Sequence, residues 1–124
     1  MGEYKIVDYH KQGRSSRNKG AQGERELAKL LSDKLGLDSI KRGYVFCRES
    51  DVIGLKGIHI ECKRVEKLNI ENAILQAKQD RNEGQFPAVF HRKNRSNWLV
   101  TMELQDWINL YNEYYSSKKL EGKQ

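Results

Sequence analysis

The sequence has few cysteines and no long hydrophobic run. Its 124 residues include two cysteines, Cys47 and Cys62, and neither belongs to a Cys-x-x-Cys pair. A structural zinc site is therefore not expected, and both thiols are predicted to be reduced and buried in strands. No apolar run approaches the roughly 20 residues that a membrane helix requires, and the first residues lack the apolar stretch of a signal peptide. These absences predict a cytoplasmic protein.

Acidic residues are also absent between His10 and Gly20, where four basic residues occur. The net charge of the chain is +6, which favours a polyanionic partner such as nucleic acid. Glycine, serine and asparagine in residues 1–20 predict an irregular basic arm that contacts DNA, with a disordered tail as the alternative. Other basic residues follow Lys63 and occur at 92–95. The predicted DNA-contacting residues are Lys11, Arg14, Arg17, Lys19, Arg64, Arg92, Lys93 and Arg95.

The most informative stretch runs from Asp51 to Lys63. Two short apolar runs flank Lys56-Gly57, a pattern that predicts a hairpin. Side chains alternate along a strand, so Glu61 and Lys63 are expected on one face, roughly 7 Å apart. The turn folds Asp51 back beside them. The sequence therefore predicts two carboxylates and one ammonium group in a small area.

Such a cluster suits metal-assisted hydrolysis of a phosphodiester. Mg²⁺ prefers carboxylate oxygens and retains waters, one of which can act as the nucleophile, and Mn²⁺ is expected to substitute for it. Lys63 can orient or deprotonate that water, or offset charge that develops on the phosphate. The alternative is a solvated surface ion pair between Glu61 and Lys63, which would contribute under about 1 kcal/mol.

The remaining chain predicts three helices and further strands. A helix is expected over 21–35, with Glu24 within its apolar stripe, where a metal ion or a lysine would pair with it. The alternative is that Glu24 only complements the helix dipole in the first turn. A second helix is expected over 70–83, capped by Asn69, with Gln76 at the edge of its stripe.

Strands are expected near 40–47, on both sides of the hairpin turn, at 88–90 and at 98–102. A final helix over about 103–115 is predicted to bury Leu104, Trp107, Ile108 and Tyr111. The order α-β-β-β-α-β-β-α predicts a single-domain α/β fold with a mixed sheet of about five strands, in which the strands around the second helix run parallel. The predicted organisation is an arm at 1–20, a domain at 21–115 and a flexible tail at 116–124.

A glutamate in the first helix, an aspartate that opens a strand and Glu-x-Lys on the next strand resemble the PD-(D/E)XK, or restriction-endonuclease-like, nuclease superfamily. The compact length, the single domain and the basic arm that leads into Gly20-Ala21-Gln22-Gly23-Glu24-Arg25-Glu26 are most similar to the Holliday junction resolvases of archaea and of some phages. The resemblance covers about residues 17–101. The chain departs from the superfamily pattern at Ser50, where the proline of the superfamily's name is absent. It also lacks the tyrosine that often follows a glutamine such as Gln76.

The resemblance implies a divalent-metal-dependent endonuclease that acts as a homodimer on branched DNA, in the host cytoplasm if the protein is viral. It implies Glu24, Asp51 and Glu61 as metal-binding acids, Lys63 as the catalytic lysine and Gln76 as an accessory residue. Two alternatives stay open. One is another nuclease of this superfamily, of the nicking repair or restriction type, and the other is a DNA-binding protein without catalysis.

Overall fold

The computed structural model describes residues 9–43 and 51–122, with side chains from residue 19 onward. Within these ranges the elements are α1 (Tyr9–Leu35), β1 (Lys41–Arg42), β2 (Val52–Ile53), β3 (Ile58–Arg64), α2 (Ile70–Asp80), β4 (Phe86–Arg92), β5 (Leu99–Thr101) and α3 (Leu104–Glu121). This order and the single mixed sheet confirm the predicted α/β fold. No helix in the described ranges is long and apolar enough to cross a membrane.

The five strands form one sheet in the order β1-β2-β3-β4-β5. β3 and β4 run parallel along seven paired residues, from Ile58 opposite Phe86 to Arg64 opposite Arg92. All other neighbouring strands are antiparallel. Parallel neighbours need a long crossover, which here contains α2. The predicted parallel crossover is therefore confirmed.

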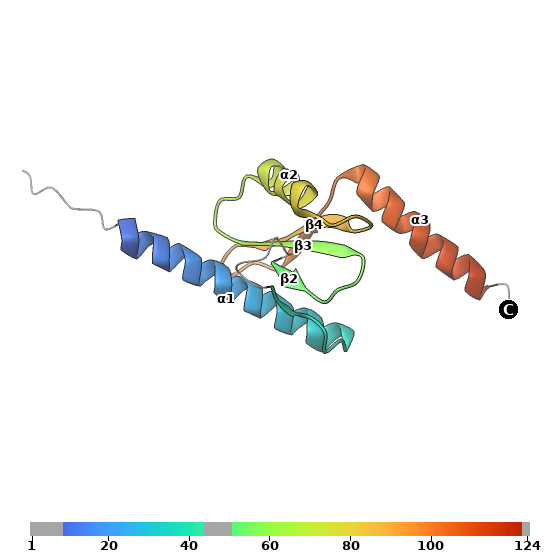
Figure 1. Cartoon of the computed structure of the whole chain (residues 1–124), viewed down its shortest axis with the longest axis horizontal. Coiled ribbons are helices and arrows are strands. Elements are labelled where there is room, and N and C mark those ends of the chain that lie inside the picture. Colours follow the sequence, from blue (N-terminus) through green and yellow to red (C-terminus); the bar gives the residue numbers. More distant parts are fainter. Residues whose placement is uncertain (1–8, 44–50, 123–124) are drawn as a thin grey trace, which may run out of the picture.

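α1 and α2 cover opposite faces of this sheet (Figure 1). On one face, Leu27 of α1 packs in a core with Ile60 and other strand residues. On the other face, Ala73 and Ala77 of α2 pack against Val89. Because helices cover both faces, the central strand β3 is buried on both sides, as strands of parallel pairs commonly are.

The predicted hairpin forms between β2 and β3. Gly57 adopts a φ of +84° in the turn, a backbone conformation that favours glycine. Val52 pairs with Ile60, and the N–H of Asp51 donates to the carbonyl of Ile60 at 3.0 Å. This pairing places Asp51 directly beside β3.

The N-terminal segment differs from its predicted secondary structure. Residues 9–20 belong to α1, so the expectation of an irregular arm is wrong for them, and residues 1–8 lie outside the described ranges. Each glycine in this segment destabilises a helix by only about 1 kcal/mol relative to alanine, and the segment contains no proline. The helix nucleus is provided by the half of α1 that packs on the sheet, so extension toward the N-terminus requires no second nucleation step.

Other element boundaries shift by a few residues. β1 occupies Lys41–Arg42 of the predicted 40–47 strand, whose residues 44–47, including Cys47, lie outside the described ranges. Asn69 caps α2 as predicted, because its side chain accepts from the N–H of Asn72. α2 ends at Asp80 rather than at residue 83. Cys62 is buried, as expected for its position in a strand.

The prediction for α3 is wrong in two respects. The helix continues to Glu121, so most of the segment predicted as a flexible tail is helical. Its apolar stripe is not buried, since 71% of Leu104, 51% of Trp107 and 48% of Tyr111 are exposed. The physical reason is that α1 and α2 already cover both faces of the sheet, which leaves α3 without a face to pack on.

A close approach of α1 to β3 generates a prediction for two glycines of one helix. A Cβ added at Gly23 would lie 2.7 Å from Cβ of Arg64, whereas at Gly20 no described atom lies within 4 Å. We expect Gly23→Ala to destabilise the fold by about 1–3 kcal/mol, because the backbones of α1 and β3 must separate.

The matched control, Gly20→Ala, is expected to stabilise the fold by roughly 0.5–1 kcal/mol through helix propensity. Urea unfolding followed by circular dichroism measures both changes. Equal changes for the two variants would show that α1 does not pack this closely on β3.

Candidate functional site

Seven predicted site residues line one cleft. The cleft has a volume of about 480 Å³ and lies where α1, the residue before β2, β3 and α2 meet. The predicted catalytic, metal-binding and accessory residues along it are Glu24, Asp51, Glu61, Lys63 and Gln76, and Lys19 and Arg64 come from the predicted DNA-contacting set. The fold thus gathers residues that are far apart in the sequence into one surface.

Asp51 is held in the cleft by the backbone of β3. Its Oδ2 accepts a hydrogen bond from the N–H of Cys62 at 2.8 Å. Burial and the nearby carboxylate of Glu61 raise the pKa of Asp51 from 3.8 to about 7, against the opposing effects of the Cys62 N–H and Lys63. The same burial raises the pKa of the Cys62 thiol. Negative charge is therefore costly at this point of the cleft.

Glu61 is almost fully buried, with an exposed fraction of 2%. Its Oε2 lies 3.3 Å from Nε2 of His59, and its Oε1 lies 3.7 Å from Nζ of Lys63. Lys63 also donates to Oε1 of Gln76 at 3.2 Å. An unpaired buried carboxylate would be strongly destabilising, so these neighbours are what allow Glu61 to lie here. His59 was not among the predicted site residues, although the two-residue period of β3 places it on the same face as Glu61.

Glu24 lines the cleft but has a different partner from the one predicted. Its Oε2 lies 2.6 Å from Nε of Arg42, which donates to it. The charge of Glu24 still contributes to raising the pKa of Asp51. Arg42 was missed, because only the pairing of β1 with β2, which sets Arg42 opposite Val52, brings it beside the cleft.

The acids of the cleft are near one another but do not form a closed metal cage. Among the described residues, no group of three or more His, Cys, Asp or Glu side chains is arranged to hold a metal ion. Glu24 points to Arg42, and Asp51 is bound to the Cys62 N–H. Asp51 and Glu61 nevertheless supply carboxylate oxygens of the kind that hard divalent cations prefer.

Two arginines predicted to contact DNA take part in a junction between α1 and the sheet. Nε of Arg92 lies 2.8 Å from Oε1 of Glu26, and Nε of Arg64 lies 3.5 Å from Oε2 of the same residue. Trp98 donates from Nε1 to Oε1 of Glu26 at 3.2 Å. Arg64 and Arg92 therefore help to fix α1 on the sheet, whatever else they contact.

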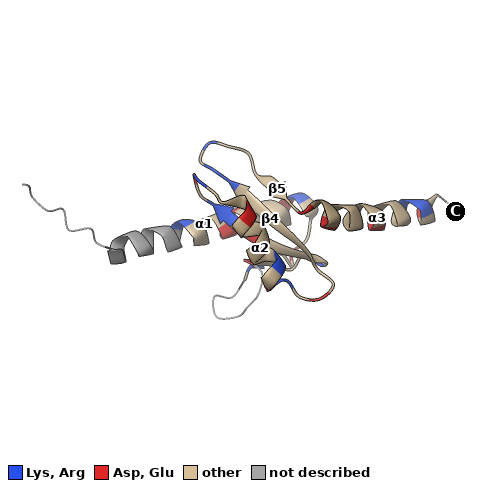
Figure 2. Ribbon diagram, turned by 90° about the horizontal axis from the view of Figure 1, so that it is seen from above, with Lys and Arg blue, Asp and Glu red and all other residues tan. Residues whose placement is uncertain are grey.

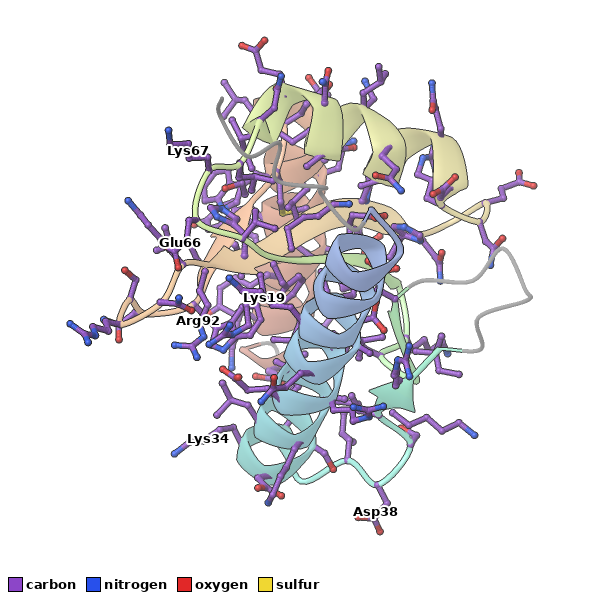
Figure 3. All side chains as sticks on the ribbon, turned by 90° about the vertical axis from the view of Figure 1, so that its left-hand side faces the viewer. Lys19, Lys34, Asp38, Glu66, Lys67 and Arg92 are labelled. Carbon is purple, nitrogen blue, oxygen red and sulfur yellow. The ribbon has the colours of Figure 1, made fainter. Side chains whose placement is uncertain are left out.

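Other predicted DNA-contacting residues lie near the cleft or in exposed loops. Lys19 lines the cleft, and Lys93 and Arg95 are exposed between β4 and β5. Figure 3 shows Lys19, Lys67 and Arg92 on the same side of α1, whereas Lys34 lies toward the opposite end of that helix. The side chains of Lys11, Arg14 and Arg17 lie outside the described residues, and their backbone belongs to α1.

The chain was also compared with known proteins. The model of one protein family, described as phage putative PDDEXK endonuclease, matches residues 15–123. The matched range covers most of the chain and includes every residue of the cleft named above. No curated protein and no solved structure gives a match. The family match supports the PD-(D/E)XK superfamily that the motif resembles, and it carries no information on Holliday junctions.

The raised pKa of Asp51 predicts a specific dependence of stability on pH without metal. The folded protein retains the proton of Asp51 up to about pH 7, whereas the unfolded chain releases it near 3.8. This acid therefore stabilises the fold at low pH, and that contribution is lost as the pH rises through about 7.

Asp51→Asn keeps an oxygen that accepts the Cys62 N–H but removes the charge. We expect it to raise the Tm in EDTA at pH 8, and much less at pH 5.

The Tm of Asp51→Asn is expected to rise by several degrees at pH 8, since about 1 kcal/mol of stability shifts the Tm of a domain near this size by roughly 4–8 °C. The control is Asp38→Asn at an exposed loop position, which should not change the pH dependence. Differential scanning calorimetry at both pH values measures the effect. An equal gain at pH 5 and pH 8 would contradict the burial of charge at Asp51.

Proposed function

Because the chain belongs to the phage putative PDDEXK endonuclease family, we propose that it is a divalent-metal-dependent endonuclease. We further propose, from the resemblance of its sequence to junction resolvases, that its substrate is the four-way DNA junction. The observation that carries the proposal is the shared cleft of Glu24, Asp51, Glu61 and Lys63. Three acids and a lysine are the groups that metal-assisted phosphodiester hydrolysis needs. A protein that only binds DNA has no need to gather three carboxylates beside one another, since they repel the phosphate backbone.

The cleft has the donor set for Mg²⁺ or Mn²⁺. Two carboxylates, Asp51 and Glu61, face the same half-buried space, where burial and repulsion from Glu61 raise the pKa of Asp51. A bound cation would relieve that repulsion, so the donors fit a hard divalent ion in both charge and chemistry. Glu24 would complete the donor set if its carboxylate released Arg42 and bound the ion instead. When bound, the ion would supply an activated water and stabilise the leaving oxygen.

Lys63 is the residue of this chain best placed to act on the reacting phosphate. Glu61 and Gln76 hold its ammonium group at the cleft from two sides. From this position the ammonium group can donate to the attacking water or to a phosphate oxygen that gains charge. Gln76 orients Lys63 from α2, which is the accessory role that we assign to it. Cys62 contributes its backbone N–H, which orients Asp51.

The substrate that we propose is DNA bound through basic residues around the cleft. Lys19 lies at the cleft itself, and Lys93 and Arg95 extend from an exposed loop. Lys11, Arg14 and Arg17 lie in the part of α1 that precedes the cleft, so this helix is proposed to follow the phosphate backbone. A homodimer would present two clefts and allow paired nicks across a four-way junction.

The experiment uses purified protein with three labelled substrates: a synthetic four-way junction, a linear duplex of the same arm sequence and a single strand. Each is incubated with Mg²⁺ or with EDTA. We expect metal-dependent paired nicks near the branch point and an intact duplex. Asp51→Asn and Glu61→Gln are expected to lose at least about a hundredfold in cleavage rate, the order of loss when one transition-state-stabilising group is removed.

Both variants should bind the junction at least as tightly as the wild type, because each removes negative charge that repels phosphate. Glu83→Gln, at an exposed turn outside the cleft, is the matched control and should cleave normally. Cleavage of all three substrates would support nuclease activity and would exclude specificity for junctions. Binding without cleavage in Mg²⁺ and in Mn²⁺ would show a DNA-binding protein without catalysis.

A further inference from the structure

α3 projects away from the sheet (Figure 1). Its large apolar side chains are exposed to solvent. None of its residues, all of which the structure describes, is buried. The exposed large side chains recur at helical spacing, which makes one continuous stripe rather than scattered positions. The stripe residues are Leu104, Trp107, Ile108, Tyr111, Tyr114 and Tyr115.

The aromatic members of this stripe are already ordered against one another. Trp107 stacks on Tyr111 with ring centroids 5.4 Å apart and an interplanar angle of 15°. Tyr111 lies 6.1 Å from Tyr114, whose ring is covered by the ammonium group of Lys118 at 5.8 Å. Leu104, Trp107, Tyr111 and Tyr114 follow the alternating three- and four-residue spacing of a helix–helix seam. The stripe is therefore a preformed surface for another helix.

The charge of α3 does not suit DNA. The helix carries three acids and only two lysines, although the chain as a whole has a net charge of +6. Figure 2 shows its ribbon largely without charged residues between its two ends. Phosphate binding requires concentrated positive charge, which is absent from the stripe. The occupant of the stripe is thus another protein surface.

The charges of α3 do not oppose the packing of two copies. At about 100° per residue, Asp106 and Glu113 lie on the side of the helix away from the stripe, and Lys118 is paired with Glu121 at 3.3 Å. Two stripes can therefore meet without like charges facing one another. Such a pairing is two-fold symmetric and closes, so it gives a dimer and no chain of subunits.

The area of the stripe is also sufficient for a dimer. An aromatic side chain buries roughly 150–250 Å² when fully covered, and those on α3 are about half exposed. Covering the whole stripe removes on the order of 700 Å² from each copy, close to the roughly 800 Å² per partner of a stable interface. We propose that two copies of this chain dimerise by packing α3 on α3, with the two stripes facing each other.

This inference rests on the homodimer that is part of the proposed function, because it names the surface through which that dimer forms. The mass of the full chain is measured without DNA or metal, by ultracentrifugation over a range of concentrations. We expect a dimer of twice 14.5 kDa. A monomer that cleaves junctions would overturn the inference alone, and a dimer that cleaves no DNA would overturn the proposed function alone.

Tyr111→Glu places a charge at the centre of the stripe and should raise the dimer dissociation constant at least about tenfold, as expected for a central interface residue. Asn109→Glu adds the same charge to the opposite side of α3 and should leave the constant unchanged. Circular dichroism verifies that both variants fold. A dimer that tolerates Tyr111→Glu as well as Asn109→Glu would overturn the proposed surface.

Discussion

The concentration of negative charge beside β3 is the constraint on which the rest of the site depends. Asp51 and Glu61 share a half-buried cleft, where burial and the charge of Glu61 raise the pKa of Asp51. The fold offsets this cost with the N–H of Cys62, the ammonium group of Lys63 and the imidazole of His59. A globular protein gains no stability from such an arrangement, which is why it indicates function rather than packing.

The layered architecture explains how the cleft is kept in place. β3 is covered by helices on both faces, so its backbone is among the most constrained parts of the molecule. Asp51 is fixed to that backbone through the N–H of Cys62, and Lys63 is fixed through Gln76 of α2. On the other side, Glu26 ties α1 to Arg64 and Arg92, which fixes the helix that also carries Glu24 two residues earlier. The position of each predicted site residue thus depends on the packing of a helix on the sheet.

Local pattern was sufficient to predict the hairpin, the shared face of Glu61 and Lys63, and the inward position of Glu24. These features follow from the periods of strands and helices and from a glycine turn. The partner of Glu24 was not predictable, because Arg42 reaches it only through the pairing of β1 with β2. The exposure of α3 was not predictable either. An apolar stripe shows that a face will be covered, and it does not show whether the cover is the same chain or another one.

The central claim is that this cleft holds a divalent cation between its carboxylates. The most direct test is a crystal of the full chain grown with Mn²⁺, with anomalous scattering measured at the manganese edge. We expect an anomalous peak between the carboxylates of Asp51 and Glu61, with Glu24 turned from Arg42 toward the ion. The absence of any peak in the cleft at saturating Mn²⁺, with Glu24 still bound to Arg42, would contradict it.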